Sequence, residues 1–119
     1  MNNSDLPNLR RVALSGAIRY TAHAMDQMLS RGIFTSDVES VLCSNTNQLI
    51  EIQSPSNALG KQHNEERDLI YDPDHIPEII VVIVLQFSPS VGILVVTAEY
   101  PEEDKWTRNT GKNPGLTRK

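Results

Sequence analysis

Two side chains suited to phosphodiester chemistry lie eight positions apart in the sequence, at His23 and Arg31. An imidazole accepts and donates protons near neutral pH, and a guanidinium pairs with phosphate oxygens. The residues between them are good helix formers, which places His23 in the first turn of a short helix and Arg31 in its last turn. Eight residues span about 12 Å of helix axis. The two side chains could therefore flank a substrate lying along the helix, although they could not both touch one atom of it.

Each of these side chains also has an ordinary structural explanation. A histidine in the first turn of a helix is commonly a surface or capping residue. A cation just before a helix end interacts favourably with the macrodipole and can bond to the last carbonyls, which is sufficient reason for Arg31. The functional interpretation therefore needs support from other parts of the chain.

The helix that carries both side chains is predicted over residues 22–31. Thr21 is a suitable N-cap, because its hydroxyl can accept a hydrogen bond from the free amides of the first turn. Apolar residues at i, i+3 and i+4 from Met25 give the helix one apolar face. Gly32 stands where a left-handed C-cap is most common.

A second helix is predicted from Thr35 to about Ser44, with Ser36 and Glu39 at the spacing of a capping box. A short strand over residues 18–20 precedes the first helix. Strand composition and turn residues predict further strands at 48–53, 67–71, 78–87 and 92–100.

The last two of these strands should pair as a hairpin in the centre of the sheet. We therefore expect an α+β fold in which two N-terminal helices pack on one face of a four-stranded, mainly antiparallel sheet.

The length of 119 residues is sufficient for one domain with a single core. We expect an α+β domain over residues 1–104 with a polar lead-in over 1–9, followed by a flexible basic tail over 105–119. The tail carries a net charge of +5 and the remainder −9. An acidic body does not attract polyanions over long range, which argues against a general nucleic-acid binder. The tail could clamp a phosphate locally or remain a solvated C-terminus.

Within this tail, Lys105, Trp106 and Arg108 place an indole between two cations. Such interleaving suits a protein that stacks on a base while holding its phosphate. The alternative is that the tryptophan anchors the tail onto the body. Both interpretations stay open on the sequence alone.

No cofactor or metal is expected. Cys43 is the single cysteine, and the candidate ligands His63, Glu65, Glu66 and His75 lack the spacing of a zinc site. The polar N-terminus and the shortness of the longest apolar run predict a cytoplasmic protein without membrane association.

A signature in two parts adds to this interpretation: Tyr20-Thr21-Ala22-His23-Ala24 with Met28 and Arg31-Gly32-Ile33, and the later Val95-Val96-Thr97. It resembles a small bacterial family of domains of unknown function. That family is similar to the ribonuclease-toxin grouping of barnase, the colicin nucleases and RelE. The match extends from about Tyr20 to Pro101. There are two departures: Gln27 stands where the pattern has an arginine, and Ser30 stands where the family usually has an acid.

The resemblance implies a metal-independent ribonuclease that cleaves RNA by attack of a ribose 2′-hydroxyl on the neighbouring phosphate. His23 would be the acid/base residue and Arg31 a phosphate ligand, while Thr97 and Arg67 would complete the groove. The tail residues Lys105, Trp106 and Arg108 would contribute to substrate binding. A cognate antitoxin, immunity or regulatory protein would be the expected partner.

Two other functions stay open. The neutral Gln27 and the acidic body favour a non-catalytic module that binds a protein or peptide along the hairpin or tail. The charge of −9 also suits an immunity-type partner of a basic toxin.

Overall fold

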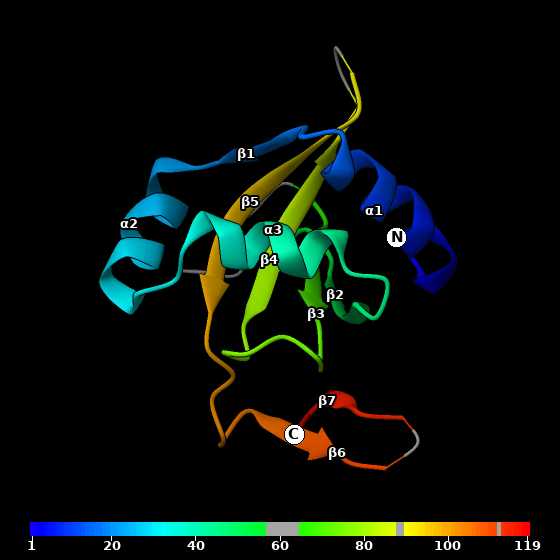
Figure 1. The fold of residues 1–119 in the computed structure, drawn as a ribbon, viewed down its shortest axis with the longest axis vertical. Coiled ribbons are helices and arrows are strands. Elements are labelled where there is room, and N and C mark those ends of the chain that lie inside the picture. The colour runs from blue at the N-terminus through cyan, green and yellow to red at the C-terminus, as the bar shows by residue number, and fades with distance from the viewer. Residues whose placement is uncertain (57–64, 88–89, 112) are drawn as a thin grey trace.

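The computed structural model describes residues 1–56, 65–87, 90–111 and 113–119, which form an α+β fold (Figure 1). The elements follow one another as η1 (Asn3–Asp5), α1 (Leu6–Leu14), β1 (Ile18–Tyr20), α2 (Ala22–Arg31), α3 (Thr35–Cys43), β2 (Gln48–Gln53), β3 (Arg67–Tyr71), β4 (Ile80–Gln86), β5 (Gly92–Glu99), β6 (Trp106–Asn109) and β7 (Gly115–Arg118).

The main sheet of the described residues has five strands in the order β1-β5-β4-β3-β2. The predicted hairpin of β4 and β5 is confirmed, with β4 at the centre. The predicted four-stranded sheet is wrong, because β1 joins it at the edge and runs parallel to β5, with Ile18 opposite Ile93. The sequence pattern of a three-residue strand is too short to predict its partner. In this fold the partner of β1 is β5, which lies more than seventy residues later in the chain.

The described residues hold three α-helices where two were predicted. The additional helix, α1, begins within the segment that we expected to be a polar lead-in and continues beyond it to Leu14. Leu6, Leu9 and Ala13 form its buried stripe, and Pro7 lies in its first turn, where a missing N–H has no cost. Asn8, Arg10 and neighbouring polar residues cover its other side, which is why the segment looked uniformly polar.

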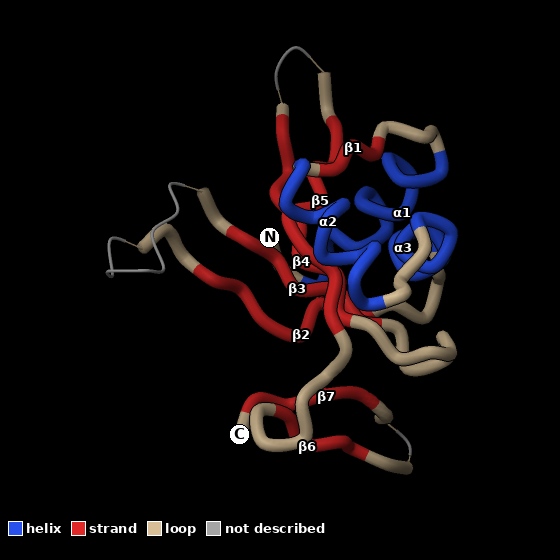
Figure 2. Tube along the Cα trace, turned by 90° about the vertical axis from the view of Figure 1, so that its left-hand side faces the viewer, coloured by secondary structure: helices blue, strands red, loops and turns tan. Residues whose placement is uncertain are grey.

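Helices α1, α2 and α3 gather on one side of the sheet (Figures 1 and 2). The core beneath them joins residues of all three helices to the inner faces of β3, β4 and β5: Leu9, Met28, Val38, Leu42, Ile70, Val81, Ile83, Ile93 and Val95 are among its members. The two predicted helices are therefore correctly placed on one face, and α1 shares that face with them.

The last fifteen residues differ most from the expected flexible tail. Trp106–Asn109 and Gly115–Arg118 pair antiparallel as a two-stranded sheet, which lies apart from the main sheet in Figure 2. Trp106 is only 4% exposed and Leu116 only 5%. They form a second apolar cluster with residues of β3 and β4, including Leu69, Tyr71, Ile80 and Val82. An apolar anchor thus holds the segment against the body.

The caps of α2 are confirmed. The hydroxyl of Thr21 accepts a hydrogen bond from the N–H of Ala24 at 2.9 Å, and Gly32 has a left-handed conformation with φ of 71°. The capping box predicted for α3 is different. The carboxylate of Asp37, rather than Glu39, accepts from the chain at the helix start, 3.0 Å from the N–H of Phe34.

Candidate functional site

The site begins where β1 stops. Strand β1 ends at Tyr20 and pairs with β5 only as far as Val95, after which the N–H of Thr21 donates to the Val95 carbonyl at 3.1 Å. Beyond this point α2 lies along the edge of β5 in place of a strand (Figure 1). There Nη1 of Arg31 donates to the carbonyl oxygen of Ala98 at 2.8 Å. The guanidinium therefore satisfies a backbone acceptor that the short strand leaves open.

The structure brings Arg31 and Thr97 together, although 66 positions separate them in the chain. Nη1 of Arg31 lies 3.3 Å from the hydroxyl oxygen of Thr97 and 3.3 Å from Oε1 of Gln27. The Thr97 hydroxyl in turn donates to the same Gln27 oxygen. Arg31, Gln27 and Thr97 form a closed set of contacts, which we call the edge cluster.

A β-bulge in β5 helps to aim Thr97. Val82 pairs with Thr97 and Ile83 pairs with Val95, so Val96 is an extra residue in the ladder. Bulges bend a strand and redirect the side chains beside them. In this protein the redirected residue contacts α2 across the edge of the sheet.

Sequence reasoning missed the parts played by Gln27 and Tyr100. In the sequence Gln27 stands as a neutral residue where the pattern has a cation, yet its i, i+4 spacing from Arg31 is the signal that predicts their contact. Tyr100 follows β5, and its hydroxyl donates to the carbonyl oxygen of Arg31 at 2.8 Å. Nothing local in the sequence pairs a tyrosine with the end of a helix so far away.

His23 lies on the same face of α2 as Gln27, one helical turn earlier. Its side chain is exposed, and among the described residues no hydrogen bond or ion pair joins it to a neighbour. The imidazole is therefore accessible to a ligand that approaches the edge cluster.

The Arg31 side chain is directed back along α2. Its Nη1 contacts Gln27, which lies one helical turn closer to His23 than Arg31 does. The hydrogen bonds that the described residues make with this guanidinium all leave from Nη1. Nη2 and Nε can therefore donate to a phosphate, and Arg31 is only partly buried.

Arg67 does not belong to this cluster. It begins β3, which β4 separates from β5, and its backbone pairs with Gln53 on the far strand β2. In the alternation of the strand it shares a side with Leu69 and Tyr71, the residues that pack on the C-terminal sheet.

Trp106 is also unavailable to a nucleic-acid base in this structure. Its ring lies in the second apolar cluster, and the guanidinium of Arg118 stacks over it at 4.2 Å from the ring centre. Of the two alternatives that the sequence left open, the structure therefore shows the tryptophan anchoring the C-terminal segment onto the body. A base could stack on the ring only if this segment left the body.

Three cations of the C-terminal segment, Lys105, Arg108 and Arg118, pair with carboxylates. Arg108 contacts Glu78 at 3.0 Å and also Glu103, and these partners raise the pKa of its guanidinium. Lys105 lies 3.3 Å from Glu102. Arg118 meets Glu51 through two hydrogen bonds, which lower the pKa of that carboxyl. The acidic body thus offsets the positive charge on which a phosphate clamp would depend.

In the described part of the chain, no group of three or more His, Cys, Asp or Glu side chains is placed to hold a metal. The candidate ligand His63 lies outside the described residues. No helix of the described segments has the length and apolar character that crossing a membrane requires.

Comparison of the chain with protein-family models, with curated proteins and with solved structures found no match in any of the three. The family resemblance noted in the sequence therefore stays a prediction.

Proposed function

We propose that this chain is a metal-independent RNA-cleaving domain whose site lies where α2 meets β5. One observation carries the proposal: the guanidinium of Arg31 turns back along α2 to Gln27, one turn from His23. A proton-transferring group and a phosphate-binding group thus face one stretch of the same helix surface. That pairing is the minimum needed for cleavage through the ribose 2′-hydroxyl.

In the proposed reaction, the phosphate lies along α2 with its non-bridging oxygens on Nη2 and Nε of Arg31. The imidazole of His23 removes the proton of the 2′-hydroxyl. The 2′-oxygen then bonds to phosphorus, the bond from phosphorus to the 5′-oxygen breaks, and water protonates that oxygen. The products are a 2′,3′-cyclic phosphate and a free 5′-hydroxyl.

Thr97 and Gln27 act in this scheme as positioning residues. Their oxygens hold Nη1 of Arg31, so the other nitrogens of the guanidinium are presented in one orientation. The four remaining predicted residues, Arg67, Lys105, Trp106 and Arg108, are left outside the proposed site because of their places in the fold.

The test is cleavage of end-labelled single-stranded RNA by the purified chain in excess chelator, with analysis of the product ends. We expect cyclic phosphate ends, and no cleavage of the same substrate with 2′-O-methyl riboses. His23→Ala should abolish the activity. His75→Gln is the matched control, because His75 contacts Pro77 and Asp37 away from the edge cluster. Equal cleavage by wild type and His23→Ala would rule out the proposed base.

A second function, a non-catalytic protein-binding module, is favoured by apolar side chains at the surface of α2 and just after it. Met25 is 44% exposed, Leu29 84% and Phe34 70%. An antitoxin or regulatory protein could cover them. A folded wild-type chain that cleaves none of the RNA substrates would favour this function over the nuclease.

A further inference from the structure

A cavity of about 290 Å³ lies between α1, the start of β3, the C-terminal end of β4 and the residue that precedes β5. It is distinct from the edge cluster, none of whose residues lines it. Its carboxyl groups come from Asp5, Glu65, Glu66 and Asp68. Much of the remaining wall is apolar and includes Leu9, Val12, Leu85 and Phe87. The cavity thus combines negative charge with a surface for hydrocarbon.

Asp68 is the residue of this cavity that most needs a ligand. Asp68 is only 1% exposed to solvent. Its Oδ1 atom is buried and has no hydrogen-bond partner among the described residues. Burial, followed by a side-chain hydrogen bond with Glu66 and then by the charge of that carboxylate, raises the pKa of Asp68 to about 7. A buried polar atom without a partner is costly and uncommon in native proteins. A donor entering the cavity would remove that cost.

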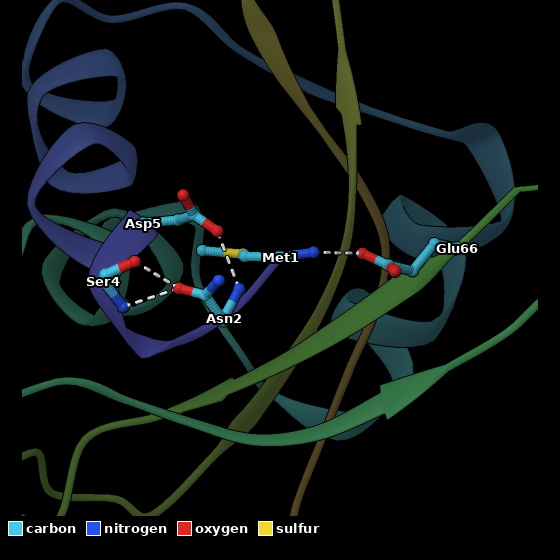
Figure 3. A network of polar contacts seen from close by, with 5 residues as sticks. All are labelled: Met1, Asn2, Ser4, Asp5 and Glu66. Atoms are coloured by element: carbon cyan, nitrogen blue, oxygen red, sulfur yellow. Dashed lines mark hydrogen bonds and ion pairs between the residues drawn. The ribbon is translucent and has the colours of Figure 1, made fainter.

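One carboxylate of the cavity already contacts a donor of the chain. The terminal ammonium of Met1 donates to Oε2 of Glu66 at 2.9 Å, and its side chain is almost fully buried beside the cavity (Figure 3). Asp5 is occupied differently, since its carboxylate accepts from the N–H of Asn2 at 2.7 Å (Figure 3). An alkylammonium group therefore already contacts Glu66 and interacts electrostatically with Asp68, but Oδ1 of Asp68 accepts no hydrogen bond from the described residues.

We propose that the cavity binds a small primary alkylammonium ion, with its NH₃⁺ group donating to Oδ1 of Asp68 and its hydrocarbon chain against Leu9, Val12 and Phe87. An ammonium carries three donors and no acceptor, which suits a cavity rich in carboxylate oxygens. A bare metal ion fits less well, because no described group of three or more ligand side chains could hold it and because half the wall is apolar.

The experiment is a titration of the full chain with n-butylammonium chloride near neutral pH, followed by backbone amide chemical shifts. We expect saturable shifts confined to residues around the cavity and at least tenfold weaker binding of n-butanol, which has the same hydrocarbon chain without the charge. Equal binding of the alcohol, or saturable shifts elsewhere only, would overturn the proposal.

Variants test the assigned atom. Asp68→Asn keeps the size of the side chain and should weaken butylammonium binding at least tenfold, because it replaces a charge-assisted hydrogen bond. Asp26→Asn, an exposed substitution on α2, should leave the affinity unchanged. An unchanged affinity in Asp68→Asn would contradict the proposed contact. Both variants are first checked for native amide spectra.

A free amine and a lysine side chain of another protein offer the same chemistry. Nα-acetyl-lysine N-methylamide separates these sources, because it carries a peptide backbone on the same alkylammonium group. Binding of both probes would identify a cavity open to a protein side chain, whereas binding of butylammonium alone would identify a site for small amines. Failure of both probes would reject the site.

Discussion

Nη1 of Arg31 lies 2.8 Å from the carbonyl oxygen of Ala98, and this contact attaches α2 to the part of the sheet edge that β1 does not cover. Open strand edges carry unpaired backbone groups that must be satisfied in some other way. Here the guanidinium that does so also has two nitrogens, Nη2 and Nε, that make no hydrogen bond with the described residues. The same side chain therefore has a structural part and a proposed chemical one, and the two can be separated by mutation.

Arg31→Ala should destabilise the fold by about 1–3 kcal/mol, since it leaves the Ala98 carbonyl and the edge cluster without their shared donor. Chemical denaturation followed by circular dichroism measures this change. Arg11→Ala is the control, because Arg11 makes only a 3.5 Å contact with Asn8 at the surface. A loss for Arg31→Ala no larger than for the control would show that the contact contributes little to stability.

Thr97→Val should raise the KM for RNA more than it lowers kcat, because the hydroxyl holds Arg31 in the orientation that we propose for phosphate binding. Thr97→Ser restores that hydroxyl and should recover most of the affinity. The measurement is steady-state cleavage of one RNA substrate by the wild type and both variants. Failure of serine to restore KM would indicate that the methyl group, and hence packing, is what matters at this position.

Trp106→Ala should cost about 3–5 kcal/mol of stability, as is typical when a large buried aromatic side chain is truncated. Trp106→Phe should cost less. At temperatures where both variants are folded, we expect RNA affinity close to that of the wild type, because the ring is covered by Arg118 and the body. A selective loss of RNA binding without a loss of stability would return Trp106 to the binding surface.

The stability of the protein should fall as pH rises from about 4 to about 7, through the carboxyl of Asp68. Its pKa is raised to about 7 in the folded chain, mainly by burial. Over this range the unfolded chain releases the proton while the folded chain keeps it, so unfolding is favoured increasingly. Above about pH 7 the folded protein bears the full cost of the buried charge.

Asp68→Asn isolates this effect, because the amide does not titrate. We expect the variant to be more stable than wild type by about 2 kcal/mol near pH 7.5 and nearly equal to it near pH 5. The neighbouring Glu66 has a lowered pKa, and the Met1 ammonium a raised one. Their contributions therefore change below and above this window. Denaturant midpoints at the two pH values, with Asp26→Asn as control, give the comparison; a constant difference would contradict it.

Elements that depend on residues close together in the chain could be predicted from the sequence. Thr21 caps the start of α2 and Gly32 caps its end, each through hydrogen bonds to residues within one helical turn. The β-branched runs of β4 and β5 form the predicted hairpin. The sequence also placed two helices on one face of the sheet, and it singled out Arg31 and Thr97. These features depend on propensity, spacing and pattern within short segments.

Contacts between distant segments could not be predicted in this way and are known from the tertiary structure. It placed β1 beside β5, packed α1 on the core, buried Trp106 and left Oδ1 of Asp68 without a hydrogen-bond partner among the described residues. Each of these outcomes depends on how whole elements pack. The local sequence of a short strand, a half-polar helix or a single tryptophan does not predict which distant residues it will contact. The contact of Arg31 with Thr97 has the same origin, because it exists only where β1 ends and α2 takes its place along β5.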